Sequence, residues 1–181
     1  MRLKKVYQAI YSKIASAFYP IKYAKKIGVN INSNCHIYGK VYWGSEPWII
    51  TLGENVYITD GVKFITHDGG TLLFRHLVPD LEVTKPIVVG SNVYFGNNVI
   101  VLPGVTIGSN VVIGAGAVVA KDIPDNSVAV GVPAKVIKSI DEYFQKLQKE
   151  SLHLGHLQGK EKDDALKKFY NYHTDSEKEH V

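Results

Sequence analysis

His67 lies in residues 64–70, FITHDGG, where several side chains that could perform chemistry come together. Asp68 follows it directly, and Glu46 precedes it in the segment GSEPWII at 44–50. A histidine can accept a proton as a general base near neutral pH, and a nearby carboxylate can orient the imidazole or bind a substrate. The alternative role of His67 and Asp68 is that of turn residues, and the alternative role of Glu46 is to cap nearby backbone amides.

The chain on both sides of His67 repeats every six residues. From residue 89 it reads VGSNVY, FGNNVI, VLPGVT, IGSNVV, IGAGAV and VAKDIP, with an earlier copy at 52–63 and a weaker one at 31–42. An α-helix cannot hold such a period on one face, whereas the first and fifth positions of an extended hexad point the same way. Asn and Gly between them favour tight corners. The repeat therefore predicts an all-β solenoid of short stacked strands.

The repeat stops at His67 and resumes after Lys85-Pro86-Ile87. The pattern resembles the hexapeptide-repeat family, whose members fold as a left-handed parallel β-helix with about eighteen residues per triangular coil. The resemblance covers a β-helix acyltransferase domain at 29–140, with an excursion loop at 68–86. An apolar stripe at helical spacing predicts a helical segment at 1–28, and the polar sequence at 141–181 predicts a helical tail. A generic β-sandwich is the alternative. Since the interval from Glu46 to His67 is just over one coil, we expect both side chains to face one groove.

Two segments resemble sugar O-acetyltransferases of this family, and most closely those that modify surface polysaccharides. They are GSEPWII at 44–50 and THDG at 66–69. The resemblance implies that His67 is the general base and that Glu46 is a second catalytic residue. Asp68 could likewise orient the imidazole or bind the acceptor. Arg75, in the loop, could contact an anionic acceptor, although solvated loop residues are the alternative for Arg75.

The segments IGAGAVVAKDIP and VGVPAKVIK resemble the part of the family that binds acetyl-CoA as co-substrate. Carried over by position, the donor contacts are Tyr94, Asn97, Ala115, Ala120, Lys121, Lys135 and Lys138. Tyr94 stands where the family usually has Trp, and Ala120 where it usually has Thr. A solvated basic rim is the alternative for the lysines. Because family sites straddle subunits, the resemblance implies a homotrimer.

Composition restricts the partners. A net charge of +4 is too mild for a nucleic-acid-binding surface, and no apolar run is long enough to span a bilayer. We expect a cytoplasmic protein, at most at the inner face of the membrane. The basic, amphipathic start of the chain could contact acidic lipids peripherally, or pack over the open end of the coil.

The sequence therefore predicts an acetyl-CoA-dependent sugar O-acetyltransferase in surface polysaccharide biosynthesis. An N-acetyltransferase of a nucleotide-linked amino sugar and a non-catalytic trimeric scaffold are the alternatives. No metal is expected, because His36, His67 and His76 are poorly spaced for the three-histidine zinc site of carbonic anhydrases on this scaffold.

Overall fold

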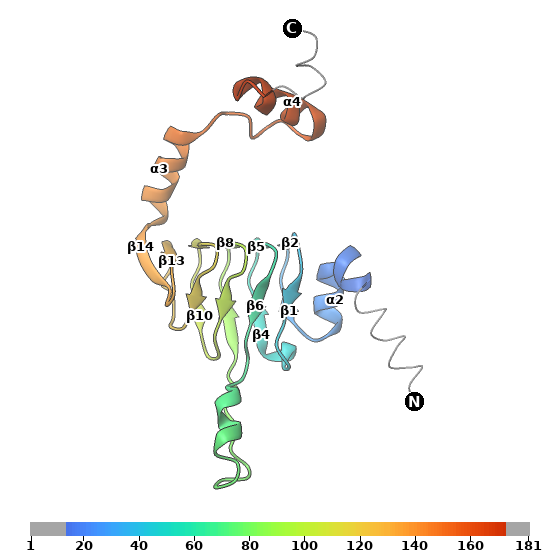
Figure 1. The fold of residues 1–181 in the computed structure, drawn as a ribbon, viewed down its shortest axis with the longest axis vertical. Coiled ribbons are helices and arrows are strands. Elements are labelled where there is room, and N and C mark those ends of the chain that lie inside the picture. The colour runs from blue at the N-terminus through green and yellow to red at the C-terminus, as the bar shows by residue number, and fades with distance from the viewer. Residues whose placement is uncertain (1–13, 173–181) are drawn as a thin grey trace. The chain divides into compact units, whose positions relative to one another are not determined.

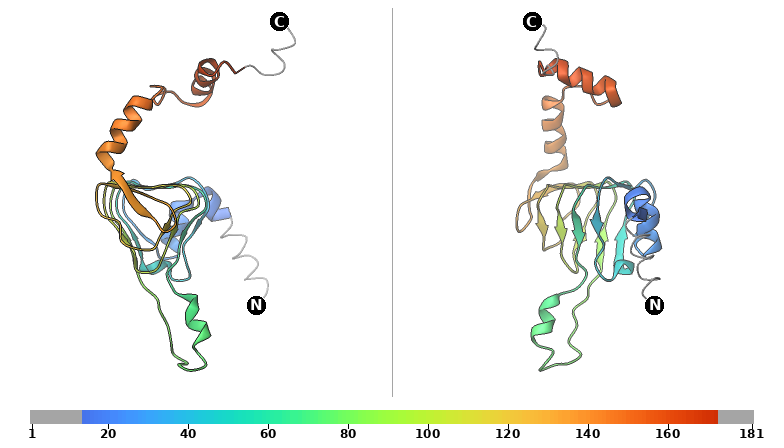
Figure 2. Two further views of the ribbon diagram at one scale, coloured as in Figure 1. Left: turned by 60° about the vertical axis from the view of Figure 1, so that its left-hand side comes forward. Right: turned by 45° about the vertical axis from the view of Figure 1, so that its right-hand side comes forward.

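The computed structural model describes residues 14–172. They fall into two units, and the boundary along the chain lies between Tyr143 and Phe144. The first unit is a left-handed parallel β-helix, and Figures 1 and 2 show its strands stacked in triangular coils. This confirms the predicted fold class.

Each side of the triangle is one sheet, and we refer to the sheets as sides A, B and C. Side A contains β1 (Asn30–Ile31), β4 (Ile50–Leu52), β7 (Ile87–Val89) and β10 (Thr106–Ile107). Side B contains β2 (His36–Ile37), β5 (Val56–Ile58), β8 (Val93–Phe95), β11 (Val111–Ile113), β13 (Ser127–Val130) and β14 (Lys135–Ser139). Side C contains β3 (Val41–Tyr42), β6 (Val62–Phe64), β9 (Ile100–Val101) and β12 (Val118–Val119). Only β13 and β14 pair antiparallel among these strands.

The core lies inside the triangle and consists mainly of side chains from the first and fifth positions of the hexads, as predicted. The first and fifth residues of the six hexads from residue 89 are all buried: Val89, Val93, Phe95, Val99, Val101, Val105, Ile107, Val111, Ile113, Ala117, Val119 and Ile123. Toward the N-terminal end of the coil, Trp43 stacks on Phe64 with 5.1 Å between ring centroids, and Phe64 meets Phe95 edge-on. Alternation along flat strands thus accounts for which side chains face inward.

Asparagines turn the chain at the corner between sides A and B. Asn55, Asn92, Asn110 and Asn126 all have φ between 56° and 58°, in the left-handed region that asparagine tolerates better than most residues. Their side chains form a ladder, in which Asn55 donates to Asn92 at 2.8 Å, Asn92 to Asn110 at 3.0 Å and Asn110 to Asn126 at 2.9 Å. The repeated Asn therefore both bends each coil and joins it to the next.

Coil length varies at the two places that matter for the site. Strands β3 and β6 pair Val41 with Val62, so the first coil is longer than the coil that leads from β8 to β11. The 3₁₀ helix η1 (Pro47–Ile49) occupies the corner of this first coil between sides C and A. At the same corner of the next coil, the excursion leaves after β6 and returns at β7, and it carries the 3₁₀ helix η2 (Gly69–Leu73). Figure 1 shows this excursion projecting from the coil.

Helices lie at both ends of the described chain. Residues 14–18 are helical and are followed by α2 (Pro20–Lys26), which contacts β1 and β2 at the first coil. Beyond β14 come α3 (Ile140–Glu150) and α4 (Gly159–Phe169). Within residues 14–172, none of the helices has the length and apolar character that a membrane span requires. Residues 1–13 of the predicted N-terminal helix and 173–181 of the predicted tail lie outside the described part.

Candidate active site

The candidate catalytic residues lie at the corner between sides C and A, where each coil passes from its third strand to the first strand of the next. Glu46 follows β3, and His67 follows β6 one coil later. Strands β3 and β6 pair in parallel, and the offset of that pairing equals the interval from Glu46 to His67. The two residues therefore occupy equivalent positions in stacked coils, as the expectation of a shared groove requires.

The backbone around His67 is fixed by the neck of the excursion. Lys85 N–H donates to the carbonyl of Thr66 at 2.9 Å, and Asp68 N–H donates to the carbonyl of Val83 at 2.9 Å. His67 and Thr84 form an antiparallel bridge between these two bonds. The coil therefore continues into a short two-stranded neck, and His67 sits on a paired backbone although it begins a loop.

Glu46 and His67 make direct contact. Nδ1 of His67 lies 3.2 Å from Oε2 of Glu46, and their side chains are 37% and 24% exposed respectively. The hydroxyl of Thr66, which is fully buried, donates to the same Oε2 at 2.6 Å. One carboxylate oxygen thus receives two hydrogen bonds, one of them from the histidine.

These bonds lower the pKa of Glu46. The hydrogen bond from Thr66 lowers the pKa of the Glu46 carboxyl below its ordinary value; partial burial opposes this, and the hydrogen bond from His67 lowers the pKa further. Glu46 is therefore an ionised carboxylate at neutral pH and can only accept hydrogen bonds. A neutral imidazole that hydrogen-bonds to this carboxylate must donate from Nδ1, which leaves the lone pair of Nε2 free.

Two cavities share His67, Asp68 and Gly69. The corner cavity, of about 440 Å³, extends from these residues along the edge of the coil, past Lys85, Leu102, Pro103 and Ala120. The loop cavity, of about 220 Å³, lies on the excursion side and is lined by Glu46, Thr71, Leu72, Arg75 and Glu82. The imidazole thus lines both the corner cavity and the loop cavity.

The two predicted acceptor residues both line the loop cavity, and both also have partners within the loop. Asp68 Oδ1 accepts from Gly70 N–H at 2.8 Å and so caps η2. Arg75 Nη2 donates to Glu82 at 2.7 Å, and Arg75 Nε donates to the carbonyl of Leu81 at 3.2 Å. The guanidinium that was expected to contact an acceptor is therefore already neutralised by a carboxylate.

The predicted donor residues fall into separate groups. Ala120 lines the corner cavity beside His67. Asn97 and Ala115 lie at the corner between sides B and C, before β9 and β12, and Tyr94 lies on the outer face of side B, half-exposed. Lys121 follows Ala120, whereas Lys135 and Lys138 lie on β14. One chain therefore brings only part of the predicted set next to His67.

The comparisons with known proteins agree with this architecture. The family described as bacterial transferase hexapeptide (six repeats) matches residues 86–121. Protein CapG of Staphylococcus aureus is 50% identical over 125 residues, which are 68% of this chain and 73% of that protein. The chain belongs to the hexapeptide-repeat transferase family.

Solved structures of the family share the fold. A maltose O-acetyltransferase from Clostridium difficile 630 aligns with a TM-score of 0.54 and 28% identity over 74% of this chain and 87% of that one. A galactoside acetyltransferase in complex with coenzyme A aligns with a TM-score of 0.53 and 32% identity, covering 68% of this chain and 71% of its own. Among residues 14–172 of this hexapeptide-repeat transferase, no three His, Cys, Asp or Glu side chains are grouped to hold a metal ion.

Sequence reasoning missed Thr66 and Lys85. Thr66 occupies the third position of its hexad, where other hexads carry turn residues such as Ser91 and Asn97. Thr66 is fully buried, and a buried hydroxyl needs a hydrogen-bond partner, but the repeat gave no signal of this burial. Gly44 leaves room for the contact, because a Cβ there would lie 2.5 Å from the Thr66 hydroxyl oxygen. Lys85, in the returning strand of the neck, gave no signal either.

Replacing Thr66 tests the origin of the lowered Glu46 pKa. In Thr66→Val the carboxylate loses its strongest donor, so the Glu46 pKa should rise toward its ordinary value, whereas Thr66→Ser should keep it low. A carboxyl whose folded pKa is depressed stabilises the fold above its ordinary pKa and loses that contribution as pH falls through the folded value. Thr66→Val should therefore cost about 1–2 kcal/mol at neutral pH, and less in acid.

Carbon-13 NMR titration of labelled glutamate and urea unfolding at pH 7 and in acid would measure the two effects. Equal Glu46 titrations in the Val and Ser variants would contradict this account of the pair.

Proposed function

We propose that the protein is an acetyl-CoA-dependent O-acetyltransferase that modifies a sugar hydroxyl, in the biosynthesis of a surface polysaccharide. The observation that carries the proposal is the position of His67, backed by Glu46 and shared by two cavities. Family membership supports the reaction class, and the sugar acetyltransferases among the structural relatives support the acceptor class.

In this proposal His67 acts as the general base. A sugar hydroxyl in the loop cavity gives its proton to Nε2 as its oxygen attacks the thioester carbonyl in the corner cavity. The new oxygen–carbonyl carbon bond replaces the carbon–sulfur bond, and the proton passes from the imidazolium to the departing thiolate. Glu46 holds the ring in the required tautomer and stabilises the positive charge that it acquires.

The corner cavity suits the donor. Its wall includes Leu102, Pro103 and Ala120, which can contact a pantetheine arm, and Lys85 adds a positive charge. At the neighbouring corner Ala115 and Gly116 are exposed, and a Cβ at Gly116 would meet no heavy atom within 4 Å, so a ligand has open access to that backbone. Lys121 is exposed, and in this proposal its ammonium group contacts a phosphate of the donor.

The loop cavity favours an uncharged or cationic acceptor. Its walls carry the carboxylates Glu46, Asp68 and Glu82 against the single guanidinium of Arg75, which pairs with Glu82. A sugar hydroxyl meets these requirements. An amino sugar meets them too, so N-acetylation of an amino group is the second candidate, and a screen of matched hydroxyl and amino acceptors separates the two.

A homotrimer would complete the donor site. Within one chain Ala120 and His67 lie at one corner of the triangle, while Asn97 and Ala115 lie at the next. About five extended residues, or roughly 16 Å, separate Ala115 from Ala120 along the strand. In a threefold assembly, the corner of one protomer that carries His67 would face residues of its neighbour, so both groups could bind the same donor.

Substituting the catalytic pair tests the mechanism directly. His67→Ala should lower kcat by about 10²–10⁴-fold, and Glu46→Gln by about tenfold or more, because each removes part of the proton transfer. The measurement is release of free coenzyme A thiol with candidate sugars. His76→Ala, in the exposed part of the excursion, is the matched control and should stay within a few-fold of the parent. If His67→Ala were as active as the parent, His67 would not be the general base.

Filling the corner cavity tests the donor site and the scaffold alternative. Calorimetry should detect acetyl-CoA binding to the parent and to His67→Ala, whereas Ala120→Trp should abolish it because the indole would occupy the cavity beside His67. The melting temperature of Ala120→Trp should remain near that of the parent, because Ala120 is exposed. A parent protein that binds no acetyl-CoA would favour the non-catalytic scaffold.

The assembly is tested by its mass. Sedimentation equilibrium should give a particle of three 20.1 kDa chains at micromolar concentration. If the active species is a monomer, the donor site cannot be shared in this way.

A further inference from the structure

The start of the chain is strongly basic although the whole protein is not. Residues 1–28 contain seven Lys and Arg and no Asp or Glu, while the full sequence contains 21 basic and 17 acidic side chains. Once those seven are set aside, the rest of the sequence carries more acidic than basic side chains. Such asymmetry indicates a segment selected for an anionic partner.

One face of α2 covers the open end of the coil. Ala24 is fully buried, its carbonyl accepts from Val29 N–H at 3.0 Å, and Tyr23 and Ile27 pack against the core. The sequence left two roles for this segment, capping the coil and touching lipid. The described residues show the cap, and they leave a second face of the segment turned away from the coil.

Outside its packed face, the segment carries both cations and exposed apolar side chains. Lys22 and Lys25 are exposed, and Lys22 Nζ lies 5.5 Å from the ring centre of Tyr19. Ile14, Phe18 and Tyr19 are 53%, 74% and 61% exposed, so most of their apolar surface is left uncovered by the coil. We call residues 14–26 the basic end.

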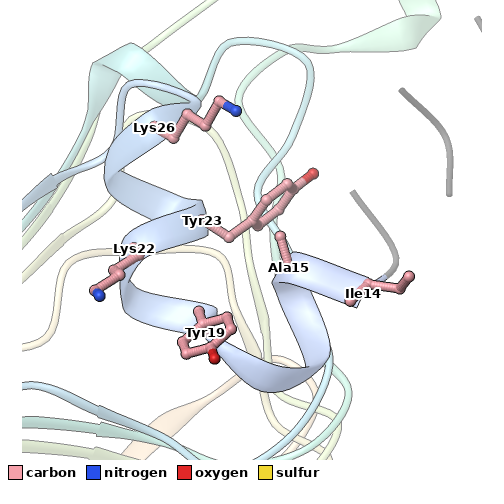
Figure 3. Close-up of a pocket in the computed structure, with 6 residues that line it drawn as sticks. All are labelled: Ile14, Ala15, Tyr19, Lys22, Tyr23 and Lys26. Carbon is pink, nitrogen blue, oxygen red and sulfur yellow. The ribbon is translucent and has the colours of Figure 1, made fainter. Parts of the chain in front are cut away.

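A cavity of about 380 Å³ opens within the basic end. Figure 3 shows its lining, which comes from the helical residues before Pro20 and from α2. Ile14, Ala15 and Tyr23 supply an apolar surface, and Lys22 and Lys26 supply ammonium groups. The lining therefore offers a hydrocarbon-compatible wall next to positive charge.

We propose that the basic end binds the surface of an anionic phospholipid bilayer. Exposed Phe18 and Ile14 would insert at the headgroup boundary while Lys22 and Lys25 contact lipid phosphates, the combination that keeps peripheral helices on membranes. A nucleic acid would use the lysines but give no role to the exposed aliphatic and aromatic side chains. The lipid surface uses both features, and it does not require that the acetyl-transfer reaction be correct.

The test is co-sedimentation of the full chain with vesicles. The protein should bind phosphatidylglycerol–phosphatidylcholine vesicles, and it should bind phosphatidylcholine vesicles at least tenfold more weakly. High salt should remove most of its affinity for the anionic vesicles. Lys22→Glu/Lys25→Glu should weaken binding by about tenfold or more. The matched control Lys160→Glu/Lys162→Glu makes the same charge change on exposed positions of α4 and should bind like the parent.

Phe18→Ser separates the apolar contribution, and it should weaken binding even in low salt. The proposal is overturned if the parent ignores anionic vesicles, if both double variants behave alike, or if DNA competes all of the protein away from vesicles at equal phosphate concentration. Melting temperatures and coenzyme A thiol release with a soluble sugar should be unchanged in all three variants, so loss of folding or of catalysis is read separately.

Discussion

Parallel hydrogen bonding between successive coils dictates which residues of this protein can meet. Each coil lies about 4.8 Å above the last, and the ladders allow no slip because one residue of slip would turn every inward side chain outward. Residues at one corner of neighbouring coils are therefore neighbours in space whatever their separation in sequence. Glu46 and His67 meet because the first coil, which contains η1, is as long as the interval between them. Had that coil kept the shorter spacing that relates β8 to β11, the carboxylate would fall out of register with the imidazole.

The same rule explains how much could be predicted from the sequence. Hexad periodicity reports inward and outward positions directly, so the solenoid and its core followed from the residues alone. The break at His67 located the corner of the candidate site, and the interval to Glu46 was close enough to a coil to suggest a shared groove. The length of the first coil could not be predicted, because it depends on the turn that Pro47 and its neighbours adopt. The hydroxyl contact of Thr66 and the pairing of Arg75 with Glu82 depend on side-chain conformations that periodicity does not describe.

The corner cavity and the loop cavity have walls of different kinds. The corner cavity is walled partly by coil backbone that is hydrogen-bonded to its neighbours, as at Leu102, whose N–H donates to the carbonyl of Val119, and partly by the neck residues Val83 and Lys85. The loop cavity is walled by the excursion, which is held by its paired neck and by the Arg75–Glu82 ion pair at its surface. An exposed ion pair is weak, about 0–1 kcal/mol. The proposed donor side therefore depends on the coil and on the paired neck, while the proposed acceptor side can diverge by loop substitutions without cost to the coil.

The basic end and the corner of the candidate site are joined through a short connection. Gly28, two residues after the end of α2, has φ +110°, and a Cβ there would lie 3.1 Å from Cβ of Trp48. Trp48 belongs to η1, the turn that Glu46 begins. The element proposed to touch lipid therefore ends against the turn that carries the proposed catalytic carboxylate, with no flexible linker between them. If both proposals hold, a membrane-bound molecule keeps its acceptor corner within about one coil of the basic end, which favours acceptors presented at the bilayer surface over those that diffuse freely.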